Sequence, residues 1–147
     1  MSEMTVVTLL EEAKIEKVLN RYATALDSRN WSELAEVFAP DATANYQGIG
    51  LCNGLGEIVE LVKSVLGQCG PTQHLLGNVD VQVNGSEAQA RCYLQAIHVG
   101  IGDYEGQILT VWGEYRDELR RTPAGWRIVY RELAGIHTEG DIGLGQE

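Results

Sequence analysis

The sequence predicts an α+β protein, because helical and strand patterns occupy different halves of the 147-residue chain. In the first half, apolar residues recur every three or four positions, as on one face of a helix. In the second half they alternate with polar residues, as in half-buried strands. No repeat or linker divides the chain. We therefore expect one domain over residues 1–147, with a flexible, glycine-rich tail over 138–147.

Three helices and a short strand are predicted in the first half. A helix over roughly residues 8–27 carries one apolar stripe, made of Ile15, Val18, Leu19, Tyr22 and Leu26. A second, short helix starts at Ser32, carries Leu34, Val37 and Phe38, and ends before Pro40. A short strand at 42–46 precedes a third helix near 55–67, with a glycine at each end.

Long strands are predicted for the second half. The first opens near Gln73 and ends at Asn84-Gly85, a strong hairpin signal. Strands over 88–99, about 105–120 and 126–133 follow, separated by turns at 100–103 and 123–125. Antiparallel strands of this length twist, and we expect them to curl around the early helices.

Charge and cysteine content narrow the range of partners. A formal charge of −10 argues against nucleic acid and against an anionic membrane surface, whereas a small neutral or apolar ligand is compatible with it. The three cysteines are widely spaced and form no CxxC pair, which favours reduced thiols over a zinc or redox site. With neither a signal-peptide pattern nor an apolar run of the ~20 residues that a membrane helix needs, we expect a soluble, cytoplasmic protein.

Asp27 and His74 are the strongest candidates for catalytic residues. Asp27 closes the first helix and His74 opens the first long strand. An imidazole and a carboxylate that meet in a pocket form a general base with a fixed tautomer. Periodicity alone places Asp27 off the apolar stripe, as a surface carboxylate, and a lone strand histidine is more often structural. Strict alternation puts His74 on the other face of the strand from the valines at 79, 81 and 83. A bulge at Gly77-Asn78 would reset the alternation and bring them to one face.

Arg131 lies late in the last strand and shares strand parity with Val129 and Leu133. An arginine among apolar neighbours needs a partner, because an unpaired buried charge is unfavourable. The alternatives are an ion pair with an acidic residue of this chain and contact with a ligand, and one residue could do both.

Three stretches of the chain resemble the nuclear transport factor 2-like superfamily over roughly residues 9–137. The stretches are Ile15-Glu16-x-Val18-Leu19-x-x-Tyr22, then Asp27-x-x-x-Trp31-x-x-Leu34-x-x-x-Phe38-x-x-Asp41-Ala42, and finally Gly125-Trp126-Arg127-Ile128. The second is fairly specific for the SnoaL-like branch. The resemblance implies a cone-shaped α+β barrel of the cystatin-like type, in which a curved, mostly antiparallel sheet wraps over three helices.

Within that branch the chain looks like the group of scytalone dehydratase, hexachlorocyclohexane dehydrochlorinase and bile-acid 7α-dehydratase. The aspartate that ends helix one and the histidine after helix three in those enzymes match Asp27 and His74. The late-strand arginine of the dehydrochlorinase matches Arg131, and the helix-one tyrosine of the bile-acid enzyme matches Tyr22. The resemblance therefore implies that these four residues are catalytic.

Four further residues are candidates for contacts with substrate, although core or sheet packing is the more common role for each of them: Tyr46, Tyr93, His98 and Trp112. His98 shares parity with Cys92 and Leu94, and a second histidine in a cavity would help to protonate a leaving group. His137 is assigned no role. We expect neither a metal nor a cofactor, because the three histidines are far apart and Gly48-Ile49-Gly50 lacks the remainder of a dinucleotide loop.

The leading interpretation is a cofactor-independent lyase, a dehydratase-type enzyme that uses a His74–Asp27 base on a small, largely apolar cyclic substrate. An isomerase or a SnoaL-type polyketide cyclase would use the same pocket, and a non-catalytic binding module is the third alternative. The apolar alternation over residues 105–120 leaves sizeable side chains on the outer sheet face. We therefore expect a homo-oligomer, a dimer or trimer, formed through that face.

Overall fold

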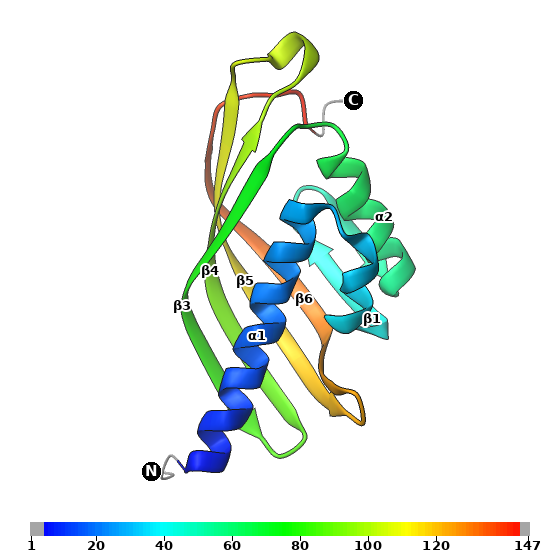
Figure 1. Cartoon of the computed structure of the whole chain (residues 1–147), viewed down its shortest axis with the longest axis vertical. Coiled ribbons are helices and arrows are strands. Elements are labelled where there is room, and N and C mark those ends of the chain that lie inside the picture. Colours follow the sequence, from blue (N-terminus) through cyan, green and yellow to red (C-terminus); the bar gives the residue numbers. More distant parts are fainter. Residues whose placement is uncertain (1–4, 145–147) are drawn as a thin grey trace.

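The computed structural model describes residues 5–144, which form a curved six-stranded sheet with helices on one face (Figure 1). The elements in chain order are α1 (Val6–Ser28), the 3-10 helix η1 (Trp31–Glu36), β1 (Phe38–Tyr46), β2 (Gly50–Asn53), α2 (Leu55–Leu66), β3 (Thr72–Asn84), β4 (Glu87–Val99), the 3-10 helix η2 (Gly102–Tyr104), β5 (Ile108–Thr122) and β6 (Gly125–Glu139). The strand order is β2-β1-β6-β5-β4-β3, antiparallel except for the pair β1 and β6. The predicted α+β class and curved, mostly antiparallel sheet are confirmed.

Helix α1 starts and ends at recognisable capping residues. The hydroxyl of Thr5 accepts a hydrogen bond from the backbone N–H of Thr8, as in an N-cap. Its apolar stripe is buried as expected and packs against the sheet. The helix ends where Arg29 adopts a left-handed conformation (φ 59°, ψ 29°), which is unfavourable by roughly 1–2 kcal/mol for most residues other than glycine. The side chain of Arg29 must therefore be held by contacts of its own.

The second predicted helix is wrong at its C-terminal end. In its place the structure has the short 3-10 helix η1, and both Phe38 and Pro40 belong to strand β1. Pro40 is tolerated there because the pairing of β1 with β6 is irregular between Phe38 and Thr43. The N–H that proline lacks is therefore not needed for a regular hydrogen bond between these strands. The four-residue edge strand β2, which pairs with β1, was too short to show a periodicity.

Two bulges decide which side chains of the long strands face the helices. In β3 the register shifts between Gly77 and Asp80, with Asn78 at φ 52°, so that His74 lies on the same sheet face as Val81. The suggested phase reset is therefore confirmed. In β6 a shift opposite Glu118 and Leu119 leaves Val129 between the paired residues 128 and 130. Arg131 therefore does not share its face with Val129, contrary to strict alternation.

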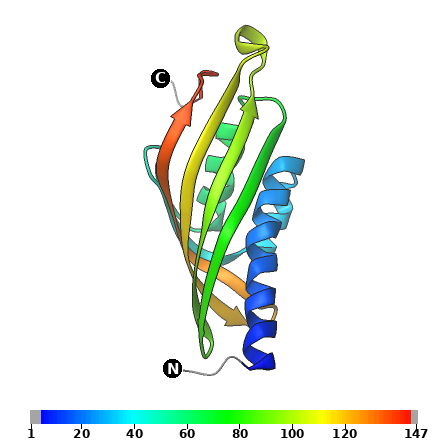
Figure 2. The ribbon, with the colours of Figure 1, turned by 90° about the vertical axis from the view of Figure 1, so that its left-hand side faces the viewer.

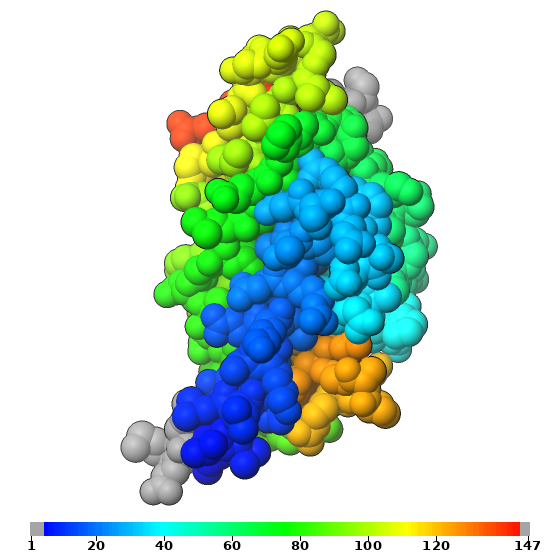
Figure 3. Space-filling model, viewed as in Figure 1, coloured from blue at the N-terminus to red at the C-terminus, as the bar shows by residue number. Residues whose placement is uncertain are grey.

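The core lies between the concave sheet face and the helices. Figure 2 shows α1 running along β3 with α2 on the same side of the sheet, and Figure 3 shows α1 and the following segment, in blue to cyan, side by side over that face. β6 continues to Glu139 and Ile142 is buried, so the expected tail packs onto the fold in part, and residues 145–147 lie outside the described range. Within residues 5–144, no helix has both the length and the apolar character that a membrane span requires.

Candidate active site

Asp27 and His74 meet at the junction of α1 and β3. Oδ1 of Asp27 lies 2.7 Å from Nδ1 of His74, and Oδ2 accepts a hydrogen bond of 2.9 Å from the backbone N–H of His74. Two contacts from one carboxylate fix both the ring and the backbone of the histidine. Because a carboxylate accepts, Nδ1 of a neutral His74 carries the proton and Nε2 presents its lone pair.

The carboxylate of Asp27 stays ionised in this setting. Burial by itself would raise its pKa, but hydrogen bonds from the side chain and backbone of His74 and from Thr72 outweigh burial, and the pKa of Asp27 lies below its ordinary value. The Asp27 side chain is 26% exposed, whereas that of His74 is 6% exposed. Asp27 can therefore orient His74 and stabilise its imidazolium form without itself becoming the base.

The ring of His74 lines a cavity of ≈100 Å³ between the helices and the sheet. The cavity has aliphatic walls formed by Leu26, Ile49, Leu61, Val62, Val65, Leu66, Leu94, Ala96, Val111 and Leu133. Its polar groups come from Tyr22, Tyr46, His74, His98 and Tyr115. A small, uncharged and largely apolar molecule suits these walls.

His98 is the second imidazole of the cavity, on β4. Its ring centroid lies 5.7 Å from that of His74, with the two planes at 77°. Nδ1 of His98 donates to the carbonyl of Leu109 at 3.2 Å, so Nε2 of the neutral ring is unprotonated. Burial, followed by the charge of His74, lowers the pKa of His98. His98 is therefore a neutral hydrogen-bond acceptor near pH 7.

Tyr22 and Tyr46 bring two hydroxyls together at the same cavity. Their oxygens are 2.7 Å apart, and both side chains are almost fully buried. Burial raises the pKa of Tyr22 and raises the pKa of Tyr46 well above its ordinary value, so both remain phenols. One hydroxyl donates to the other, which leaves the hydrogen of the second available for an oxygen of a bound molecule.

Arg131 lies behind the tyrosines rather than in the cavity wall. Its Nε and Nη2 atoms donate to the two carboxylate oxygens of Asp117 at 2.7 and 2.8 Å, and both side chains are fully buried. Its Cζ atom lies 4.3 Å from the ring centre of Tyr22 and 3.9 Å from that of Tyr115. Of the two alternatives for this arginine, the structure shows the ion pair. The expected contact with a leaving group is not seen. Arg131 is absent from the cavity lining, and its Nε and Nη2 atoms are bound to Asp117.

The charge of Asp117 stabilises the protonated form of Arg131. Burial would lower the pKa of Arg131, but the adjacent carboxylate raises it well above its ordinary value. Nη1 has no hydrogen-bond partner within residues 5–144, in keeping with its position between aromatic rings. The guanidinium therefore supports the tyrosine side chains through cation–π contacts.

Tyr93 and Trp112 do not line the cavity, which corrects the expectation for both. Leu94 on β4 and Val111 on β5 line the cavity. Because successive strand residues face opposite sides, Tyr93 and Trp112 lie on the outer sheet face. Tyr93 is 52% exposed, and Trp112 stacks on His137 with ring centroids 5.5 Å apart. Tyr46 and His98, in contrast, lie at the cavity as expected.

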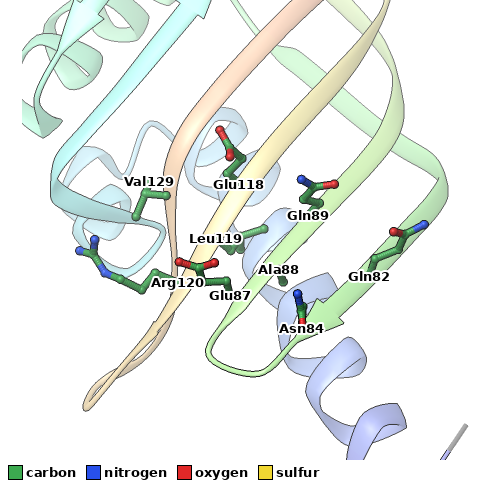
Figure 4. Close-up of a pocket in the computed structure, with 9 residues that line it drawn as sticks. All are labelled: Gln82, Asn84, Glu87, Ala88, Gln89, Glu118, Leu119, Arg120 and Val129. Carbon is green, nitrogen blue, oxygen red and sulfur yellow. The ribbon is translucent and has the colours of Figure 1, made fainter. Parts of the chain in front are cut away.

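A second depression, of ≈320 Å³, lies on the sheet face away from α1 (Figure 4). Its polar lining comes from Gln82, Asn84, Glu87, Gln89, Glu118 and Arg120. None of these side chains is an acid–base group with an ordinary pKa near neutrality. Although this depression is the larger, the cavity at His74 is the better candidate for chemistry.

Three supporting residues were not predicted from the sequence: Arg29, Thr72 and Asp117. Asp117 was recognisable in principle, because it stands between Tyr115 and Leu119 on the apolar face of β5. A carboxylate in that position needs a buried cation. Arg29 and Thr72 carried no comparable signal. Each is a polar residue at the boundary of an element, Arg29 after α1 and Thr72 at the start of β3.

All three cysteines are unpaired and buried. Burial raises the pKa of Cys92 to about 11, which makes this thiol a poor nucleophile near neutral pH. The chemistry of the cavity therefore rests on its imidazoles and phenols.

Comparison with known proteins agrees with this architecture. The family model of the SnoaL-like domain matches residues 7–132. An uncharacterised protein of Mycobacterium tuberculosis, Rv2910c, is 34% identical over 131 residues, which cover 88% of each chain. A candidate scytalone dehydratase from Novosphingobium aromaticivorans is 26% identical with a TM-score of 0.83, over 92% of this chain and 91% of that one.

A more distant structure shows the same fold. The hexachlorocyclohexane dehydrochlorinase LinA-type3 from Novosphingobium barchaimii is 18% identical with a TM-score of 0.81, over 92% of this chain and 93% of that one. The family model spans most of the chain, including both residues of the Asp27–His74 pair. The chain is a member of the SnoaL-like domain family, with the nuclear transport factor 2-like fold.

Proposed function

We propose that this protein is a cofactor-independent lyase that eliminates a leaving group from a small, neutral, largely apolar ring. The observation that carries the proposal is the 2.7 Å contact between Asp27 and His74, with the imidazole at a cavity whose lining is mostly aliphatic. An oriented histidine whose free nitrogen faces a water-poor space is suited to removing a proton from carbon. The mostly aliphatic lining of the cavity supports a largely apolar substrate.

The proposed reaction begins at Nε2 of His74. This nitrogen removes a proton from a carbon next to an activating group such as a carbonyl. The C–H electron pair forms the new double bond, and the bond to the leaving group breaks with its electrons. A departing hydroxide takes the proton from the His74 imidazolium and leaves as water, which restores the neutral base. Asp27 stabilises the imidazolium in between, and the phenol pair Tyr22–Tyr46 donates to the activating oxygen.

Two structural neighbours support elimination as the reaction class. One is described as a candidate scytalone dehydratase and the other as a hexachlorocyclohexane dehydrochlorinase, and both names denote loss of a small group with formation of a double bond. The chain shares their fold, and its own Asp27–His74 pair supplies the base that such a reaction needs.

Isomerisation or ring closure of the SnoaL cyclase type is the second candidate, and the state of His98 favours it. A neutral His98, with its pKa lowered, is a poor donor to a departing hydroxide, so elimination depends on the His74 imidazolium alone to protonate the leaving group. A reaction in which His74 removes a proton and returns it to another carbon has no leaving group to protonate. The mass of the product separates the alternatives, since dehydration loses one water and isomerisation loses none.

Deuterium exchange tests for the base and does not require the physiological substrate. Monocyclic ketones and hydroxyketones would be incubated with the protein in D2O, and NMR would report deuterium at the carbon next to the carbonyl. We expect exchange or elimination by the wild type, and a loss of about 10²–10⁴-fold in H74A and D27N. The matched controls are H137A and D103N, whose side chains are exposed.

The proposal is wrong if H74A and D27N remain folded and exchange protons at the wild-type rate. Tight ligand binding that is unchanged by H74A would instead indicate a non-catalytic binding module.

A further inference from the structure

We propose that Arg29 and Thr72 are positioning residues, which hold Asp27 in the orientation that fixes the tautomer and direction of His74. Neither side chain lines the cavity, so both would act through Asp27 rather than on a substrate. The purpose of this arrangement rests on the proposed function, but the hydrogen-bond chain itself is independent of any reaction.

Arg29 joins the end of α1 to the start of β3. Nη1 donates to the carbonyl of Leu26 and to Oγ1 of Thr72, both at 2.8 Å, and Nη2 donates to the carbonyl of Gly70 at 2.6 Å. Asp27 follows Leu26 directly, and His74 lies two residues beyond Thr72. One guanidinium therefore ties together the two segments that carry the base and its partner, which are 47 positions apart in sequence.

The hydrogen-bond donors and acceptors give this chain of contacts one direction. A guanidinium only donates, so Oγ1 of Thr72 accepts from Arg29 and its single hydrogen is left for another acceptor. That acceptor is Oδ1 of Asp27, at 2.9 Å. The contacts therefore run from Arg29 through Thr72 to Asp27 and on to His74.

The carboxylate of Asp27 consequently receives three donors. Oδ1 accepts from Thr72 and from Nδ1 of His74, and Oδ2 accepts from the backbone N–H of His74. Because both oxygens accept hydrogen bonds, the carboxylate of Asp27 is held in one orientation. The ring of His74, which donates to it, is held as well. Thr72 also stabilises the ionised form of Asp27, since its hydrogen bond lowers the pKa of this residue.

The backbone of Arg29 indicates that its side chain is the reason for an arginine at this position. A helix that ends in the left-handed conformation usually has glycine or asparagine there. Arg29 adopts φ 59° nonetheless. The variant R29G is therefore informative, because glycine suits this backbone conformation and the substitution removes the guanidinium with the rest of the side chain.

The test compares R29G, T72V and T72S with the wild type by NMR. We expect the pKa of Asp27, followed by its ¹³C carboxyl resonance, to rise in T72V and in R29G and to stay near the wild-type value in T72S. The ¹⁵N resonances of His74 should lose the signature of a single Nδ1–H tautomer in T72V and keep it in T72S. R91A is the matched control, since Arg91 is exposed and lies 3.6 Å from Glu114.

Kinetics supply a second measurement once a substrate is found. We expect T72V and R29G to lower kcat by about 10- to 100-fold, as for the loss of a hydrogen bond to a charged group, with KM little changed. T72S should recover most of this loss.

The proposal is overturned if T72V and R29G lower the thermal midpoint while the Asp27 titration and the His74 resonances stay at their wild-type values. If a variant does not fold, T72S and R29K decide. Lysine offers one nitrogen where Arg29 uses both Nη1 and Nη2, so full retention of the wild-type Asp27 titration and His74 resonances by R29K would also overturn the proposal. These readouts need no turnover. A failed exchange assay therefore refutes the proposed function alone, and unchanged resonances refute the positioning role alone.

Discussion

Removing the charge of Asp117 should destabilise the fold strongly while leaving its shape intact. D117N is nearly isosteric, but it leaves the fully buried guanidinium of Arg131 without a counter-charge. Arginine cannot release its proton at accessible pH to escape this situation. Breaking a buried pair in this way lowers the free energy of unfolding by about 3–5 kcal/mol. An unfolding entropy of roughly 0.3 kcal/mol/K for a chain of 147 residues converts this loss into a fall in Tm of roughly 10–16 °C.

The opposite variant, R131M, leaves Asp117 buried and unpaired. We therefore expect R131M to be about as destabilising as D117N. The double variant D117L/R131M buries two apolar side chains in place of the pair and should be more stable than either single variant.

Urea unfolding at 25 °C, followed by tryptophan fluorescence, measures each free energy of unfolding. D41N is the control, because the pair Asp41–Arg120 is exposed with atoms 3.6 Å apart, and its loss should be below about 1 kcal/mol. A loss of under about 1 kcal/mol in D117N, or a double variant whose loss equals the sum of the single losses, would refute the reasoning.

Three further outcomes are expected. Y22F and Y46F should each slow the reaction by about 10- to 100-fold while the fold is retained, checked by circular dichroism; unchanged rates would exclude the phenol pair from the mechanism. Because the pKa of His98 is lowered on folding, its stabilising contribution is complete above the ordinary value of 6.5 and is lost as the pH falls below it. Urea titrations at pH 7.5, 6.0 and 5.0 should therefore show a smaller pH dependence in H98Q than in the wild type, and identical slopes would contradict this. We also propose that the chain forms a dimer or trimer through the outer sheet face, where Leu75, Tyr93 and Ile136 are 60%, 52% and 64% exposed around a groove of ≈520 Å³. Light scattering that gives a mass near the 16.1 kDa of one chain at micromolar concentration would disprove it.

The parts of the fold that could be predicted from the sequence are those set by local patterns. The stripe on α1 and the alternation on β4 to β6 reflect which face of one element is buried, and this can be recognised within a short window of sequence. The second predicted helix is an exception, because the structure has η1 followed by β1 in its place. This difference could not be recognised within a short window of sequence. Phe38 is fully buried in either arrangement, and the choice depends on pairing with β6, 90 residues further along the chain at Ile128.

The candidate site was predictable only where a family resemblance supplied the tertiary arrangement. Periodicity placed Asp27 on the surface, because it describes a helix face and not what lies beyond the end of a helix. In the structure that end faces the start of β3, where His74 and Thr72 donate to the carboxylate. The pairing of Arg131 with Asp117 could have been inferred by asking which acidic residue interrupts an apolar strand face.

The bulges explain why the site was harder to predict than the core around it. A long strand that follows strict alternation keeps one face inward along its whole length, and a sheet that curves over helices needs interruptions. At Gly77-Asn78 the interruption allows His74 and Val81 to face the helices from opposite ends of β3. At Val129 it turns Arg131 inward toward Asp117, behind the two tyrosines. The irregularities that curve the sheet therefore also determine which polar side chains reach the interior. A rule with a fixed period of two misplaces His74 relative to Val81, and Val129 relative to Arg131, for this one physical reason.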